Sequence, residues 1–174
     1  MKNYIKKLLP LLFLFLAPIC SKAQLTDTSD LTKVGDTAPT FDFDIAKDKK
    51  ASLNDYKGKI IMINFFATWC PPCALELPRV QKEIWEKYKD NPKFALLIFG
   101  RDEGWDKMLP FKEKNKYTFL MLPDVGKKIY SKYATQYIPR NVLIDENGKI
   151  IYQSMGYSEE EFNSMVKLIA KKLK

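Results

Sequence analysis

The chain has no histidine among its 174 residues and only three cysteines, Cys20, Cys70 and Cys73. Without histidine, Cys–His catalysis, histidine metal ligation and proton transfer through an imidazole are all excluded. Internal repeats and low-complexity segments are also missing, and no break in composition marks a second domain. The length therefore fits one folded domain, and 46% apolar and 29% charged residues are ordinary for a globular protein.

The sequence has little that could cross a membrane. The apolar run at residues 8–16 contains a proline and is too short to span a bilayer comfortably. Lysines precede this run and Ser21-Lys22-Ala23 follows it, which is the order of a secretory signal peptide. We expect a signal peptide at 1–23, a mature domain at 24–174 with its core at about 35–173, and export to the bacterial periplasm.

Two other fates of residues 1–23 remain open. They could stay uncleaved as a membrane anchor, or the chain could be a lipoprotein carrying lipid on Cys20. Against lipidation, Ile19 precedes Cys20 where a small residue is usual.

Charge is not concentrated in this sequence. The formal net charge is +8, and removal of residues 1–23 takes four lysines and no acidic residue, which leaves +4 over residues 24–174. The remaining excess is mild and scattered, so it indicates a solvated surface and no nucleic-acid partner.

Apolar patterning predicts an α/β domain. Ile60–Phe66 is a near-continuous apolar run that suits a strand buried on both faces. Further strands are expected at residues 41–44, 94–99, 117–122, 142–144 and 149–152, with Asn147-Gly148 in the turn between the last two. Helices are expected from Cys73 to a stop at Asn91-Pro92, at 105–114 with Pro110 interrupting or kinking it, at 126–134, and at the C-terminus behind a Ser158/Glu161 capping box. The core order β-α-β-α-β-α-β-β-α predicts a mixed sheet flanked by helices, after a polar N-terminal extension.

Cys70 and Cys73 lie where the buried strand gives way to a helix. Pro71 suits the first helical turn, which places Cys70 at the helix start, where unpaired N–H groups and the helix dipole favour thiolate over thiol. Cys73 follows one turn later on the same face and can attack a mixed disulfide held on Cys70. We therefore assign Cys70 as the attacking thiol and Cys73 as the resolving thiol.

Other uses of a Cys-x-x-Cys pair fit less well. A zinc site needs two more ligands, which the mature chain does not offer as cysteine or histidine. A structural staple across so short a loop constrains the unfolded chain little. A Cu(I) site is a third alternative. We expect no metal and no cofactor.

Residues 65–73, FFATWCPPC, closely resemble the active-site stretch of the thioredoxin superfamily, in particular its TlpA/ResA-like branch of extracytoplasmic thiol–disulfide oxidoreductases. The resemblance extends to Gly58-Lys59, Ile138-Pro139 and residues 143–150, and covers most of 35–173. It implies a thioredoxin-like three-layer fold, with a central mixed β-sheet between helices, and a redox-active Cys70–Cys73 disulfide.

The same resemblance implies a substrate-binding loop. Pro139 would be the cis-proline of the family, although an isolated X-Pro bond is cis only about one time in twenty. The Ile138 backbone would then pair with an extended substrate strand beside Cys70. Trp69 is expected to cover the disulfide as a partner surface, with a packed loop aromatic as the alternative. Arg140 departs from the small residue usual after this proline, so it either favours acidic partners or is an ordinary solvated arginine.

Glu76 matches a glutamate that this branch carries three residues after the second cysteine. A partly desolvated carboxylate one turn beyond Cys73 would have a raised pKa and could accept the Cys73 proton. The alternative is an exposed glutamate paired with Arg79. Asn64 stands where thioredoxin itself has a buried aspartate, and an asparagine cannot titrate.

The direction of electron flow is expected to be reductive. Both residues between the cysteines are prolines, and neither histidine nor lysine adjoins the pair, so little stabilises the thiolate strongly. The resemblance agrees: it implies a membrane-embedded electron donor and protein thiol or disulfide substrates, including apocytochrome c. We expect a monomer.

Three rival functions are kept. A peroxiredoxin-like peroxidase would share the fold, but it requires threonine three residues before its reactive cysteine, where this chain has Ala67. A copper-delivery module would need a further ligand such as histidine. A non-enzymatic interaction domain would keep its function when Cys70 is replaced by serine.

Overall fold

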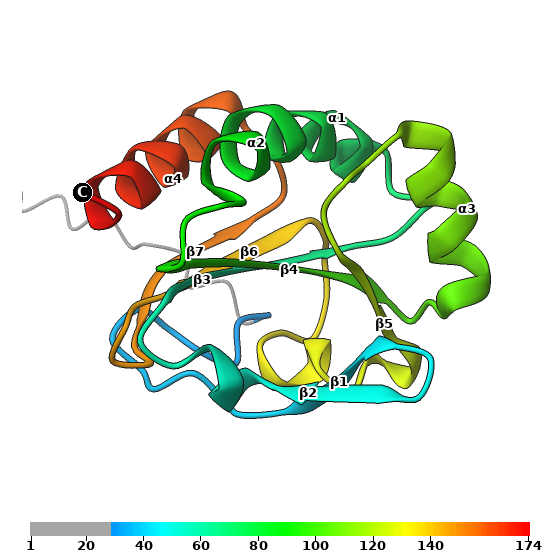
Figure 1. Ribbon diagram of the computed structural model, residues 1–174, viewed down its shortest axis with the longest axis horizontal. Helices are drawn as coiled ribbons and strands as arrows, with labels where there is room; N and C mark the ends of the chain where they lie inside the picture. The colour runs from blue at the N-terminus through cyan, green and yellow to red at the C-terminus, as the bar shows by residue number, and fades with distance from the viewer. Residues whose placement is uncertain (1–28) are drawn as a thin grey trace, which may run out of the picture.

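The computed structural model describes residues 29–174, so the expected signal peptide and Cys20 lie outside the described part of the chain. Its centre is a five-stranded sheet in the order β5-β4-β3-β6-β7 (Figure 1). The strands are β3 Ile60–Phe66, β4 Phe94–Arg101, β5 Met121–Asp124, β6 Arg140–Ile144 and β7 Ile150–Met155. β3, β4 and β5 are parallel, whereas β6 and β7 pair antiparallel. The predicted mixed sheet is confirmed.

Strand β3 is central because both of its faces are covered. All seven of its residues are buried, as its continuous apolar run predicted. Met62 and Phe66 point into a core cluster shared with the helices, and Ile61 and Phe65 into a cluster on the opposite face. The alternation of a β-strand therefore divides one strand between two cores.

Helices cover one face of the sheet (Figure 1). They are α1 Pro71–Arg79, a π-helical turn Val80–Trp85, α2 Glu86–Tyr88, α3 Trp105–Asn115 and α4 Glu159–Lys172. The helix predicted after Cys73 is thus one continuous helical segment with a π turn inside it. Pro78 has no N–H to donate to the preceding turn, and the π turn begins two residues later. Helix α3 continues past Pro110, so the expected interruption there does not occur.

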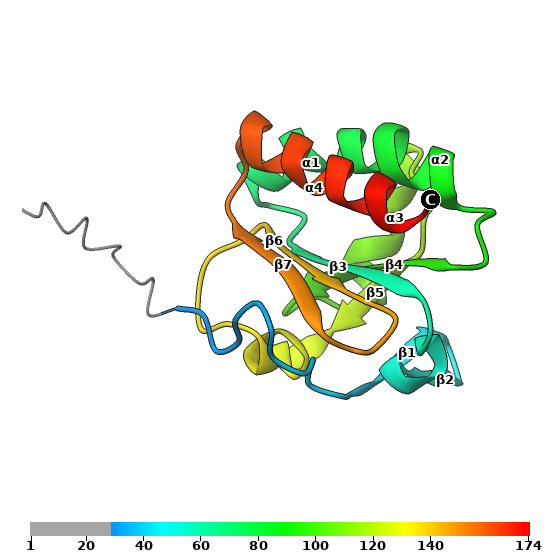
Figure 2. The same cartoon turned by 90° about the vertical axis from the view of Figure 1, so that its left-hand side faces the viewer.

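The opposite face carries smaller elements. Strands β1 Asp42–Ala46 and β2 Lys49–Ser52 form an antiparallel pair, followed by the 3-10 helix η1 Leu53–Tyr56 (Figure 2). Every second side chain in the first half of β1 is buried, which confirms the half-exposed strand predicted at residues 41–44. This pair packs on the face of the sheet opposite the helices and forms part of the third layer.

Two predicted elements differ from the structure. The strand expected at 117–122 is β5, which pairs with β4 only over Met121–Asp124, while Tyr117 and Phe119 reach the core from a connecting segment. The helix expected at 126–134 is wrong: the chain forms two short 3-10 turns, η3 Val125–Lys127 and η4 Tyr130–Lys132.

The break between η3 and η4 has a local cause. Gly126 has φ +74° and Lys127 has φ +57°, and left-handed backbone ends a right-handed helix. The Asp124 carboxylate then accepts N–H bonds from Ile129 and Tyr130, both at 2.8 Å, and holds the chain in its new direction.

The hairpin and the terminal helix lie where the sequence predicted them, and of the expected Ser158/Glu161 capping box the structure shows the bond made by the Ser158 side chain. β6 and β7 pair across a turn in which Gly148 has φ +78°, and the Ser158 hydroxyl accepts the Glu161 N–H at 3.2 Å to cap α4. No helix within residues 29–174 is both long and apolar enough to cross a bilayer.

Candidate redox site

Cys70 is the N-cap residue of α1, as its position before Pro71 predicted. Its sulfur is bonded to that of Cys73 in a disulfide, with Sγ atoms 2.01 Å and Cα atoms 5.3 Å apart. The Cys73 N–H points at the Cys70 sulfur over 3.3 Å. The end of β3 and the first turn of α1 therefore place one sulfur where a helix start offers a donor to a negative charge.

The disulfide is recessed but open to the surface. Cys70 keeps 4% of its surface exposed and Cys73 1%. Cys70 lines a depression of about 290 Å³ together with Trp69, Pro71, Pro72, Arg101, Tyr137 and Ile138. Trp69 is 65% exposed at the rim, which excludes the alternative that it is a packed loop aromatic. A partner can therefore approach Cys70, whereas Cys73 lies behind it.

A loop ending at Pro139 faces this disulfide. The Ile138–Pro139 peptide bond is cis, as the resemblance implied. The Ile138 carbonyl oxygen lies 3.8 Å from the Cys70 sulfur, so the loop and the helix start form two walls of one depression. The strand β6 begins immediately afterwards and fixes the loop to the sheet.

Glu76 is buried, and the alternative of an exposed Glu76–Arg79 pair is wrong. Its side chain is 1% exposed, and Arg79 instead pairs with Glu83 at 2.6 Å. The Asn141 amide donates to one Glu76 oxygen at 2.6 Å and the Asn64 amide donates to the other at 2.9 Å. Asn64 also donates to the Asn141 carbonyl at 2.8 Å, so the three side chains form a ring of hydrogen bonds, which Asn141 extends to the Ser154 hydroxyl.

Burial controls the protonation of Glu76. Loss of water around the carboxylate raises the pKa of Glu76 to about 7, and the two amide hydrogen bonds lower it only in part. This is the direction of shift that the sequence predicted for this position. A carboxyl group one turn from Cys73 is therefore able to take up or release a proton near neutral pH.

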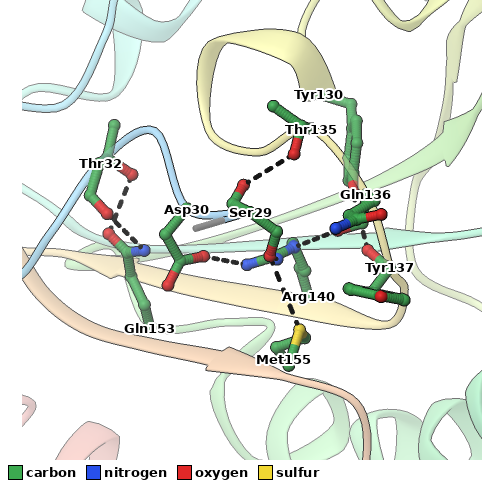
Figure 3. A network of polar contacts seen from close by, with 10 residues as sticks. All are labelled: Ser29, Asp30, Thr32, Tyr130, Thr135, Gln136, Tyr137, Arg140, Gln153 and Met155. Carbon is green, nitrogen blue, oxygen red and sulfur yellow. Dashed lines mark hydrogen bonds and ion pairs between the residues drawn. The ribbon is translucent and has the colours of Figure 1, made fainter. Parts of the chain in front are cut away.

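Arg140 differs from both expectations drawn from the sequence. Its side chain is buried at 3% exposure, so it is neither a solvated arginine nor a surface charge that favours acidic partners. Figure 3 shows it paired with the Asp30 carboxylate and bonded to the Ser29 hydroxyl and the Gln136 carbonyl oxygen. No local pattern predicts this contact, because Asp30 lies 110 residues away in the sequence.

Several site residues were missed by the sequence analysis. Asn141 holds Glu76, and Tyr137 and Arg101 line the depression, with the Arg101 guanidinium 4.7 Å from the centre of the Tyr130 ring. Buried Glu103 accepts both the backbone N–H of Thr68 at 2.9 Å and its hydroxyl at 2.7 Å, which fixes the loop leading to Cys70. Glu103 lies four positions beyond the end of the strand expected at 94–99, and its local sequence does not reveal that it is buried.

Within the described residues, no group of three or more histidine, cysteine or acidic side chains is placed to hold a metal ion. The Cys70–Cys73 disulfide gives this site the chemistry of a disulfide and its dithiol. A cysteine pair at a helix start, on a mixed sheet layered with helices, defines the class of thioredoxin-fold thiol–disulfide proteins.

Comparison with known proteins narrows this class. The Redoxin family matches residues 33–169, and the chain belongs to this family. It is 33% identical over 129 residues to the thiol-disulfide oxidoreductase ResA of Bacillus thuringiensis (strain Al Hakam), an alignment that covers 74% of this chain and 73% of ResA.

Two solved structures agree with this membership. One is a solution structure from Bacteroides thetaiotaomicron, provisionally named a protein disulfide isomerase, with 39% identity, a TM-score of 0.80 and coverage of 83% of this chain and 92% of that one. The other is a Chlorobium tepidum protein provisionally named thiol:disulfide interchange protein DsbE, with 25% identity, a TM-score of 0.72 and coverage of 82% and 99%. The protein is thus a thiol–disulfide oxidoreductase of ResA/DsbE type with a thioredoxin-like fold.

Proposed function

We propose that this protein is an exported reductase of disulfides in particular exported proteins, with Cys70 as the attacking thiol and Cys73 as the resolving thiol. The observation that carries the proposal is the placement of the Cys70 sulfur at the start of α1 and in an open depression, with Cys73 behind it. In this arrangement a foreign sulfur reaches Cys70 first.

The exchange runs in two displacements. In the reduced protein the Cys70 thiolate attacks one sulfur of the substrate disulfide, which forms a mixed disulfide and releases a substrate thiolate. The Cys73 thiolate then attacks the Cys70 sulfur and expels the second substrate thiolate. The substrate gains two electrons and becomes a dithiol, while the protein becomes the Cys70–Cys73 disulfide that the structure contains.

Glu76 is proposed as the acceptor of the Cys73 proton. Cys73 must be a thiolate before it can attack, and its buried position disfavours charge. A carboxylate with a pKa of about 7, one turn further along α1, matches a thiol more closely than an ordinary glutamate does. The Asn64 and Asn141 amides keep the Glu76 carboxylate in place during the transfer.

Substrate binding is proposed at Trp69, Ile138 and Pro139. The half-buried Ile138 presents backbone beside Cys70, and backbone pairing accepts many substrate sequences. The exposed Trp69 indole offers apolar contact area at the rim of the depression.

The proposal also covers the direction of electron flow, the cellular location of the protein and its redox partners. Proline at both positions between the cysteines supports a moderately low reduction potential, and the signal-like residues 1–23 support export to the periplasm as a 24–174 domain. The resemblance to the TlpA/ResA-like branch supports re-reduction by a membrane-embedded donor and a role in cytochrome c maturation. A redox titration that placed the couple among the strongest periplasmic oxidants would contradict the reductive direction.

The assignment of the two cysteines is tested by trapping. Cys73→Ala removes the resolving thiol, so we expect partners to accumulate as mixed disulfides on Cys70, seen as bands that disappear with dithiothreitol. Cys70→Ser in the same host is the matched control and should accumulate none. Equal trapping by both variants, or trapping through Cys73 in the Cys70 variant, would reverse the assignment.

A further inference from the structure

The first described residues pack against the segment that leads into the Pro139 loop. The Leu31 N–H donates to the Tyr133 carbonyl and the Thr135 N–H donates to the Ser29 carbonyl, both at 2.9 Å. Between them Asp30 forms an antiparallel bridge with Ala134. The N-terminal lead-in is therefore paired, backbone to backbone, with the chain just before the loop.

Arg140 connects the same lead-in to the far side of the loop. Its guanidinium pairs with the Asp30 carboxylate and bonds the Ser29 hydroxyl, and its Nε donates to the Gln136 carbonyl oxygen at 3.1 Å (Figure 3). A planar guanidinium can hold several acceptors in a fixed geometry, which a lysine ammonium cannot. Because Arg140 is buried, weakening its contact with Asp30 costs more free energy than weakening an ion pair at the surface would.

The carbonyl groups of the loop are held one after another. Arg140 binds that of Gln136, and the Tyr130 hydroxyl donates to that of Tyr137 at 2.7 Å. The next carbonyl, that of Ile138, faces the Cys70 sulfur. Tyr137 has φ +70°, a conformation that a non-glycine residue keeps only where its surroundings impose it. The contacts of its neighbours hold Tyr137 in this conformation, and the exposed Tyr137 lines the depression.

We propose that Arg140, held by Asp30, is a positioning residue for the loop Gln136–Pro139, so that the N-terminal lead-in sets how well a peptide backbone docks beside Cys70. The inference rests on the proposed function only in taking Ile138 and Pro139 as substrate-binding residues. Arg140 and Asp30 act on docking of the substrate and leave the reactivity of the Cys70 thiol unchanged.

The test compares two disulfides with the reduced protein. One is a linear peptide dimer joined by a single disulfide, which has backbone to pair with the loop. The other is dithiobis-nitrobenzoate, which has none. Arg140→Lys and Asp30→Asn should lower the second-order rate constant for the peptide disulfide at least about fivefold, since small displacements of positioning groups cost up to about a hundredfold. The rate constant for dithiobis-nitrobenzoate should stay within about twofold of the wild type, and the measured pKa of Cys70 within about 0.3 unit of it.

Thr32→Val is the matched control. The Thr32 hydroxyl ties the same lead-in to Gln153 on β7 at 2.9 Å without contacting Arg140, so its loss should leave the peptide rate constant within about twofold. An equal loss in Thr32→Val, or equal losses for the two disulfides in Arg140→Lys and Asp30→Asn, would overturn the inference in favour of general loosening. Unchanged peptide rates would overturn it as well.

The test of Arg140 also covers a variant that does not fold, and it includes a double variant. If Arg140→Lys does not fold, Asp30→Asn decides alone, because the Asp30 side chain is 38% exposed and tolerates replacement. If both variants fold, the double variant should lose no more than Arg140→Lys does, since Asp30 acts through Arg140; additive losses would contradict this. A wild type that reduces no peptide disulfide would contradict the proposed function itself, whereas an active wild type with insensitive variants would contradict only the role of Arg140.

Discussion

Glu76 is a buried acid, and its negative charge is disfavoured because the carboxylate has lost its water. Two asparagine amides stabilise its carboxylate, yet desolvation outweighs them and raises the pKa of Glu76 to about 7. The balance suits proton exchange with a neighbouring thiol, and it also gives Glu76 a pH-dependent contribution to the stability of the protein.

The pH dependence has a definite sign. Between the ordinary glutamate pKa of 4.5 and about 7, folded Glu76 holds a proton that the unfolded chain has lost. The contribution of Glu76 to the free energy of unfolding therefore falls as pH rises through this window, by about 3 kcal/mol in total, and is constant above it. Glu76→Gln should remove this fall, measured by urea unfolding of the oxidised protein at several pH values.

The matched control is the same substitution at Glu86, which is exposed further along the same helical segment. Glu86→Gln should keep the wild-type fall in stability. For the proposed proton transfer, Glu76→Gln should also raise the pKa of Cys73 and slow the release of a mixed disulfide. An unchanged Cys73 pKa and release rate would refute the role of Glu76 while leaving the stability argument intact.

At the scale of elements, capping decides where helices begin. Cys70 and Ser158 are both N-cap residues, and each side chain accepts an N–H from the residue three positions on. At Ser158 this contact serves the helix alone, whereas at Cys70 the same geometry favours a reactive thiolate. The same N-cap contact therefore stabilises the helix start in α4 and favours an ionised sulfur in α1.

Ser158→Ala should destabilise the protein by about 1 kcal/mol, because the Glu161 N–H loses its acceptor and α4 frays at its start. Urea unfolding measures the change. Ser164→Ala, an exposed position inside the same helix, is the control and should stabilise slightly because alanine has the higher helix propensity. Equal effects at the two sites would show that capping contributes nothing here.

At the scale of the whole molecule, the sheet separates two cores. Ile61 belongs to the core beside β1 and β2, and Met62 to the core beneath the helices, although they are neighbours in one strand. At the end of β3 that leads to Cys70, Phe66 and Phe65 are buried in these same two cores.

Ile61→Ala and Met62→Ala should each reduce the free energy of unfolding by about 2–5 kcal/mol, because both side chains leave cavities in packed surroundings. Val34→Ala, at a position 60% exposed, should change it by less than about 0.5 kcal/mol. Chemical denaturation measures all three. Tolerance of either β3 substitution would mean that one face of the sheet is not a true core.

Local patterns determined much of this protein. The buried strand Ile60–Phe66, the helix start at Cys70, the hairpin turn at Gly148 and the cap at Ser158 depend on neighbouring residues, and each occurs where the sequence predicted it. The helix expected at 126–134 was wrong because apolar spacing does not reveal the left-handed backbone at Gly126 and Lys127. The cis-proline was predictable only by resemblance, since spacing alone favours a trans bond.

Tertiary structure alone decided what surrounds the charged groups of the site. Glu76 meets Asn141 across 65 residues of sequence and Arg140 meets Asp30 across 110. Whether a carboxylate or a guanidinium is solvated or buried depends on which strands become neighbours, and a single helix or strand does not contain that information. The sequence therefore determined which sulfur atoms react, whereas the packing of the sheet decided the pKa beside them and the support of the loop that faces them.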